Sequence, residues 1–156
     1  MIPNETLFSV CNFIVLPGWL LLLFAPGWKW TERVIYSYTL PLILAAVYAV
    51  LLALNLGKAE GGFGSLDDVY TLFGTPQILL AGWIHYLAFD LFVGSWIVRD
   101  AQTQTISHLL IVPCLVLTFL AGPTGLLLYF VLRWALRREL VVRAPRASGV
   151  GGVGLG

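Results

Sequence analysis

Long apolar stretches separated by short polar segments dominate the pattern of this chain. A helix needs about 20 apolar residues to cross the hydrocarbon core of a bilayer. Four stretches approach or exceed this length, over about residues 6–26, 34–55, 76–98 and 107–134. None of them alternates between apolar and polar residues, as the strands of a membrane β-barrel do. The pattern therefore predicts an all-α fold, an integral membrane four-helix bundle that occupies residues 1–138.

Composition strengthens the membrane assignment. Of the 156 residues, 59% are hydrophobic and only 11% are charged, and the mean hydropathy of +0.89 lies far outside the range of soluble domains. We therefore expect a multi-pass protein of a bacterial inner or photosynthetic membrane, or of a plastid membrane. The lipid bilayer is its expected partner, and nucleic acid is not.

Two polar segments interrupt or follow the bundle. Between the second and third spans, Ser65 is followed by Asp67, Asp68 and an apolar pattern, which is typical of a helix start. This predicts a short cytoplasmic helix at about residues 65–73, either a plain surface helix or a lid over the bundle. Residues 139–156 are basic and Gly-rich, which predicts a flexible tail that contacts other membrane subunits if the protein belongs to a complex.

The distribution of Lys and Arg predicts the orientation, because cytoplasmic flanks retain these residues. Four crossings would place the N-terminus, the middle loop and the tail on one side, together with the basic residues Lys58, Arg133, Arg137, Arg138, Arg143 and Arg146. The opposite side would hold Lys29, Arg33 and Arg99. Both termini are therefore expected in the cytoplasm.

The third span carries two ionisable residues, His85 and Asp90, near its middle. Such residues are costly inside a bilayer and usually mark function. At 100° per residue they lie about 140° apart, so they cannot be assumed to hydrogen-bond to each other. Gly94, on the Asp90 face, would admit another helix closely, and Tyr48 and Asn12 are candidate partners. Each residue can serve as a structural helix-helix contact, and His85 also as a proton-transfer group or a ligand to a pigment metal.

An aromatic series follows the same helix and can be either packing core or a wall on which a flat or polyene ligand stacks. Its members are Trp83, Tyr86, Phe89, Phe92 and Trp96. Carotenoid or (bacterio)chlorophyll is the corresponding bound pigment. No Cys/His spacing of a metal site is present, and Cys11 and Cys114 are expected to be packing residues.

Asp100 and His108 flank the short connection between the third and fourth spans and should therefore be neighbours. They can form an acid/base pair near the membrane interface. Alternatively they are an ordinary contact between helix ends, with Ser107 capping the following helix.

Several motifs point to one family. AGWIHYLAFDLFVGSWIVRDA (residues 81–101), ISHLLIVPCLVLTFLAGPTGLLLY (106–129) and the early pattern FxxxNFxVLPGWLLL (8–22) resemble the neoxanthin synthase (abscisic-acid-deficient-four-like) membrane proteins of plastids and their bacterial relatives. The resemblance covers about residues 7–133 and leaves out the tail. It implies a protein that handles carotenoids, because plant members are linked to converting the epoxide violaxanthin into the allenic neoxanthin.

That reaction is an isomerisation without net redox, so it requires no diffusible cofactor. It needs an acid at the epoxide oxygen and a base at a neighbouring carbon. Carried onto this chain, the resemblance makes His85, Asp90, Asp100 and His108 the candidate catalytic residues, with the roles of acid and base left open.

Three hypotheses follow. The first is a carotenoid-epoxide isomerase. The second is a noncatalytic transmembrane subunit of a photosynthetic or light-harvesting pigment-protein complex, which binds pigment or stabilises assembly. The third, a small transporter or proton-coupled protein, ranks last because the sequence shows one acid in mid-membrane, no inverted repeat and no pair of broken helices.

Overall fold

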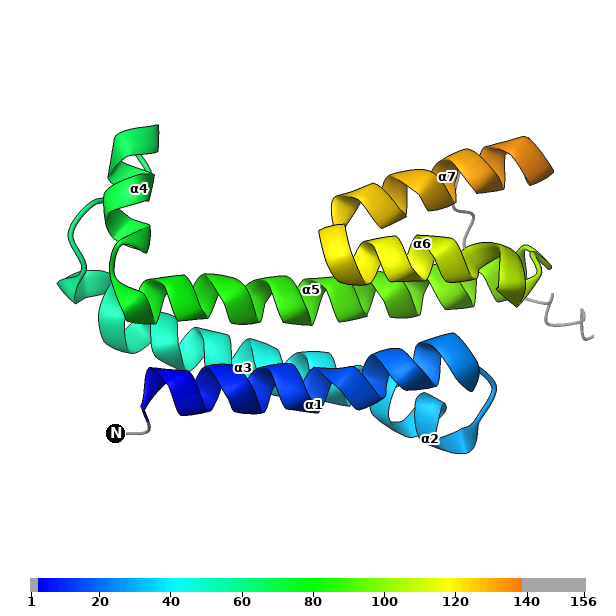
Figure 1. The fold of residues 1–156 in the computed structure, drawn as a ribbon, viewed down its shortest axis with the longest axis horizontal. Coiled ribbons are helices and arrows are strands. Elements are labelled where there is room, and N and C mark those ends of the chain that lie inside the picture. Colours follow the sequence, from blue (N-terminus) through cyan, green and yellow to red (C-terminus); the bar gives the residue numbers. More distant parts are fainter. Residues whose placement is uncertain (1–2, 139–156) are drawn as a thin grey trace, which may run out of the picture.

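Three long helices form the body of the molecule. The computed structural model describes residues 3–138, and all regular structure within that range is helical. Helices α1 (Asn4–Phe24), α3 (Thr39–Asn55) and α5 (Pro76–Thr103) run side by side along the long axis (Figure 1). Each lies in a segment long and apolar enough to cross a membrane. The protein is therefore an integral, multi-pass membrane protein, and long apolar helices are confirmed at the first three predicted spans.

Helix α5 is the central helix. In the most apolar 18-residue stretch of α5, 56% of the residues are buried. The corresponding stretches are 28% buried in α1 and 17% buried in the segment that contains α3. Gly94 of α5 explains the close approach of α1, because a Cβ added there would lie 2.8 Å from the ring of Trp19. The prediction that Gly94 admits a neighbouring helix is therefore confirmed.

The fourth predicted span is wrong. Instead of one helix over residues 107–134, the chain forms α6 (His108–Ala121) and α7 (Pro123–Arg137), which fold back on each other as a hairpin (Figure 1). Gly122 makes the turn with a φ of 36°, a value that favours glycine. Gly125 allows the two helices to touch, since a Cβ there would lie 2.2 Å from Thr118 of α6.

The hairpin runs along about half the length of α5 and returns. Its turn lies beside the middle of α5, because a Cβ added at Gly122 would be 2.7 Å from Oδ1 of Asp90. Its open end lies at the end of α5, where Arg137 donates a 2.7 Å hydrogen bond to the carbonyl of Thr105. The 14 residues of α6 give a helix of about 21 Å at 1.5 Å per residue, too short to cross the membrane.

The hairpin also changes the charge argument. The start of α1 and the end of α7 lie at opposite ends of the long axis (Figure 1), unlike the two ends of a bundle with four full crossings. The expectation that both termini are cytoplasmic stays a prediction. Basic residues of the described range now gather at the α7 end, namely Lys29, Arg33, Arg99, Arg137 and Arg138, whereas Lys58 lies at the other. The predicted tail, residues 139–156, lies outside the described residues.

The predicted short helix between the second and third spans is confirmed as α4 (Leu66–Phe73). Ser65 caps it, because its hydroxyl accepts a 3.0 Å hydrogen bond from the backbone N–H of Asp68. Short helical turns make the other connections: α2 (Lys29–Thr31) and η1 (Glu32–Tyr36) precede α3, and η2 (Leu56–Lys58) follows it.

Candidate functional site

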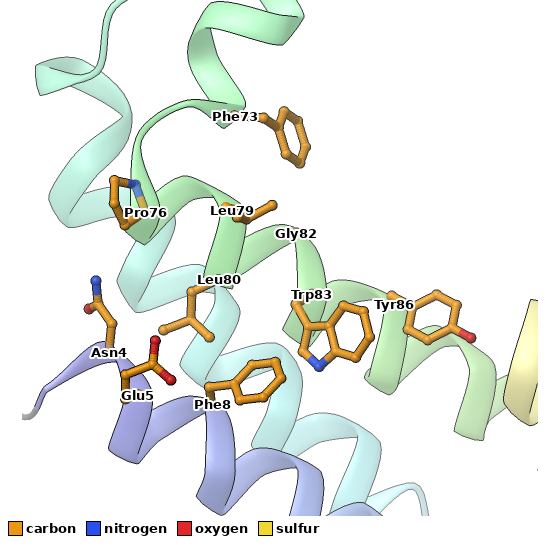
Figure 2. Close-up of a pocket in the computed structure, with 10 residues that line it drawn as sticks. All are labelled: Asn4, Glu5, Phe8, Phe73, Pro76, Leu79, Leu80, Gly82, Trp83 and Tyr86. Carbon is orange, nitrogen blue, oxygen red and sulfur yellow. The ribbon is translucent and has the colours of Figure 1, made fainter.

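An elongated groove, here called the α1–α5 groove, lies at the end of the bundle where α1 and α5 begin (Figure 2). It has a volume of about 560 Å³. Apolar and aromatic side chains from α1, α4 and α5 form its walls. Its lining residues are Asn4, Glu5, Phe8, Phe73, Pro76, Leu79, Leu80, Gly82, Trp83 and Tyr86.

The aromatic walls follow from spacing on α5. Trp83 and Tyr86 are three residues apart and therefore share a helix face, and their ring centroids lie 5.5 Å apart. Phe8 of α1 packs against Trp83 at 5.6 Å. Gly82 lets Phe73 of α4 come close, because a Cβ at that position would lie 2.7 Å from the Phe73 ring.

The groove has a polar group at each end. The carboxylate of Glu5 lies at the end where α1 begins, and the hydroxyl of Tyr86 lies at the other (Figure 2). The Tyr86 hydroxyl donates a 3.1 Å hydrogen bond to the carbonyl of Phe119 in α6. Between the two ends, the Trp83 indole N–H donates to the Asn12 side chain at 3.2 Å. A ligand in the groove would thus lie along an apolar floor with oxygen-bearing groups at both ends.

Asp90 lies one helical turn beyond Tyr86 on the same face of α5. Its side chain is only 8% exposed, and within residues 3–138 its Oδ2 atom has no hydrogen-bond partner. The two partners suggested by the sequence lie elsewhere: Asn12 bonds to Trp83, and Tyr48 packs against His85. The element over Asp90 is instead the turn of the hairpin.

His85 lies on a different face of α5, as its helical spacing predicts. The residue is exposed, and its ring stacks on Phe89 at 4.4 Å and packs against Tyr48 of α3 at 5.4 Å. It lines neither of the grooves described here. The structure therefore does not bring His85 and Asp90 together.

A second groove, here called the α3–α5 groove, has a volume of about 330 Å³ and an almost wholly apolar lining. It contains two of the predicted pigment-binding residues, Phe89 and Phe92. Trp83 and Tyr86 belong to the α1–α5 groove, whereas Trp96 packs edge-on against Tyr129 of α7 at 5.8 Å. The aromatic series is thus divided among three surroundings and does not form one continuous wall.

Asp100 is part of a buried cluster that joins α5 to α7. Its Oδ2 accepts a 2.5 Å hydrogen bond from the Tyr129 hydroxyl and lies 3.3 Å from Nε of Arg133. Tyr129 and Arg133 are both fully buried. The anticipated contact with His108 is replaced by these two, and His108 Nε2 lies 2.9 Å from the carbonyl oxygen of Leu23.

Sequence reasoning missed several residues and misplaced one cap. Glu5 was overlooked because an acidic residue in the first turn of a helix is ordinary. Tyr129 and Arg133 were placed away from Asp100 because the fourth span was drawn straight. Ser107 does not cap α6, which has no side-chain cap. Cys11 and Cys114 are buried and free, as expected.

Comparison with known proteins gives one match. The family model described as ABA4-like (ABA DEFICIENT 4-like) matches residues 6–129. This range includes the α3–α5 groove, Asp90, most of the α6–α7 hairpin and the α1–α5 groove except for Asn4 and Glu5, which precede it. No curated protein and no solved structure matches the chain significantly.

Proposed function

The chain belongs to the ABA4-like family, and we propose that it binds carotenoids and isomerises a carotenoid epoxide to an allene. The protein that gives the family its name is linked to neoxanthin synthesis. The proposed substrate is therefore a carotenoid with an epoxide on a terminal ring, reached from the bilayer without a diffusible cofactor.

The observation that carries this proposal is the α1–α5 groove. A polyene is long, flat and apolar, and it stacks favourably on aromatic rings such as those of Phe8, Trp83 and Tyr86. An oxygenated end ring needs polar neighbours, which Glu5 and Asn4 supply at the end where α1 begins. The groove thus matches both parts of such a ligand.

The chemistry requires one proton to be delivered and one to be removed. A neutral carboxylic acid donates its proton to the epoxide oxygen as the C–O bond opens. The resulting carboxylate then removes a proton from the neighbouring chain carbon, which completes the allene and restores the acid. Atoms and charges balance with no co-reactant, so a single carboxyl group can serve as both acid and base.

Glu5 is the carboxyl group that lines the groove, and we assign it this role. Of the candidate residues drawn from the sequence, Asp90 lies nearest to the α1–α5 groove, because it follows Tyr86 by one helical turn at the inner end of the groove. His85 is exposed beside Tyr48, and Asp100 and His108 are engaged at the far end of α5. These three therefore have no part in the proposed reaction.

The test is the pigment profile of membranes from a host that makes 5,6-epoxy carotenoids, with and without the protein. Chromatography and mass spectrometry should detect a new isobaric allenic product with the unaltered chain. Glu5→Gln should abolish this product while pigment still binds, and Trp83→Ala should weaken binding. Phe92→Ala, in the α3–α5 groove, is the matched aromatic control and should leave the product unchanged. An unchanged profile with folded protein contradicts the isomerase.

Pigment binding without chemistry, as in a subunit of a light-harvesting complex, is the second candidate function. The α3–α5 groove supports it, because its Tyr38, Phe89 and Phe92 rings form a binding surface that holds no reactive group. In that case purified protein carries an unaltered pigment, carotenoid or (bacterio)chlorophyll. Phe92→Ala then reduces the bound pigment, and Glu5→Gln changes nothing.

A further inference from the structure

The tip of the α6–α7 hairpin meets an ionisable group halfway through the membrane. Asp90 is the fifteenth of the 28 residues of α5, and the turn at Gly122 lies directly against its carboxyl group. Both half-helices therefore end at the depth where an ionisable side chain is most costly. A proton-coupled protein ranked last on the sequence because no pair of broken helices was visible; the structure instead has two half-helices, α6 and α7, that meet at this tip.

Asp90 shares its hydrogen-bond donor, Tyr86, with a second acceptor. The single O–H of Tyr86 is donated to the carbonyl of Phe119. The Asp90 carboxyl group, one turn further along the same face, is also within hydrogen-bonding reach of this hydroxyl, which has only one proton to donate. Oδ2 of Asp90 is buried and has no partner within residues 3–138. The carboxyl group is therefore short of donors, and a positive charge at this point would satisfy the acceptor that is left over.

The surrounding charges do not supply that positive charge. The ion pair seen in the described part of the chain joins Arg133 to Asp100, near the open end of the hairpin. On the α1 side, Trp19 packs against Gly94 and against Phe119. The carbonyl end of α6 and the amide end of α7 meet at the tip, so their opposite dipoles largely offset each other, while the end carbonyl oxygens of α6 remain beside the carboxylate as ligands.

We propose that Asp90, with the Tyr86 hydroxyl and the carbonyl end of α6, binds one positive charge, a proton or a monovalent cation, in mid-membrane. Half-helices whose carbonyl ends point into the bilayer centre bind Na⁺ or H⁺ in membrane transporters. Binding here would join the hairpin tip to α5, so the charge state of the site and the position of the hairpin are coupled. This proposal does not depend on carotenoid chemistry.

Infrared difference spectroscopy on pigment-free protein in lipid nanodiscs tests the site. One arm steps the pH in choline chloride, and the other exchanges choline for Na⁺ at constant pH. The readout is the C=O stretch of a protonated carboxylic acid and the carboxylate bands that replace it. Asp90→Asn removes the charge with little change in shape, and Asp67→Asn, on exposed α4, is the matched control.

A proton site shows a protonated-acid band that is lost in Asp90→Asn, kept in Asp67→Asn and insensitive to Na⁺. A cation site shows carboxylate bands that shift with Na⁺ until the shift saturates. The unaltered protein and Asp67→Asn should show this shift, and Asp90→Asn should not. Identical spectra for the unaltered protein and Asp90→Asn in both arms overturn the proposal. If Asp90→Asn does not fold, Tyr86→Phe takes its place and should shift the carboxyl or carboxylate band. An unshifted band would show that the carboxyl group does not face the Tyr86 hydroxyl, and this result also overturns the site.

Discussion

The buried cluster of Asp100, Tyr129 and Arg133 should hold the hairpin against α5, and its members should contribute unequally. Arg133→Met keeps much of the side-chain volume but leaves the Asp100 carboxylate, 7% exposed, without its countercharge. Removing one partner of a buried ion pair typically costs about 3–5 kcal/mol. Because Asp100 lies near the end of α5, where water is closer, we expect a loss of about 3 kcal/mol in the free energy of unfolding.

Tyr129→Phe removes only the hydroxyl that donates to Asp100 at 2.5 Å. Hydrogen bonds to charged groups contribute about 1.5–3 kcal/mol in soluble proteins, whereas interhelical hydrogen bonds in membranes average about 0.6 kcal/mol. An intermediate loss of about 1 kcal/mol is therefore expected. The double variant Asp100→Asn with Arg133→Met should cost less than the sum of its parts, because neither charge is then left alone.

The assay is unfolding by SDS from mild detergent micelles, followed by the fluorescence of the six tryptophans. Arg137→Met is the matched control, since Arg137 lies one turn further along α7 but is exposed; we expect a change within about 0.5 kcal/mol. Strict additivity of Asp100→Asn and Arg133→Met, or an Arg133→Met loss no larger than that of the control, would refute the reasoning.

Three further predictions concern packing, capping and orientation. Gly125→Ala should lower the free energy of unfolding by about 1–3 kcal/mol, because its Cβ would overlap α6, while Gly57→Ala, in open space, should be nearly neutral in the same SDS titration. Ser65→Ala should weaken α4 by about 1 kcal/mol, seen as faster amide exchange over residues 66–73 and not in α5. The basic end of the bundle should face the cytoplasm. An impermeant thiol reagent should then label Glu60→Cys from outside and Gln102→Cys only after permeabilisation, and the reverse pattern contradicts the assignment.

The spans formed by α1, α3 and α5 could be predicted because hydropathy and length alone determine whether a helix crosses a bilayer. The start of α4 could also be predicted, since Ser65 followed by acidic residues is a local signal for the start of a helix. These features depend on residues close together in sequence, and the structure confirms them.

The hairpin could not be predicted in this way. Residues 107–134 are apolar on both sides of Gly122, so hydropathy cannot distinguish one long helix from two half-helices. The adjacent Gly122 and Pro123 were the available signal, and Arg133 was a second one, because it was taken as a flank residue and is in fact fully buried. The partners of Asp90 and Asp100 depend on this fold and were therefore missed with it.

The hairpin also gives the protein an uneven outline in the plane of the membrane. Within the described residues, α1, α3 and α5 run along the length of the molecule, whereas α6 and α7 lie beside one half of α5 (Figure 1), and we expect them to add their cross-section to one leaflet alone. The molecule is thus a wedge, broader in the leaflet next to its basic end. Lipids packed around such a shape are under least stress where the membrane bulges toward the broad side. The protein is therefore expected to gather in curved regions of its membrane and to favour that curvature where it is abundant.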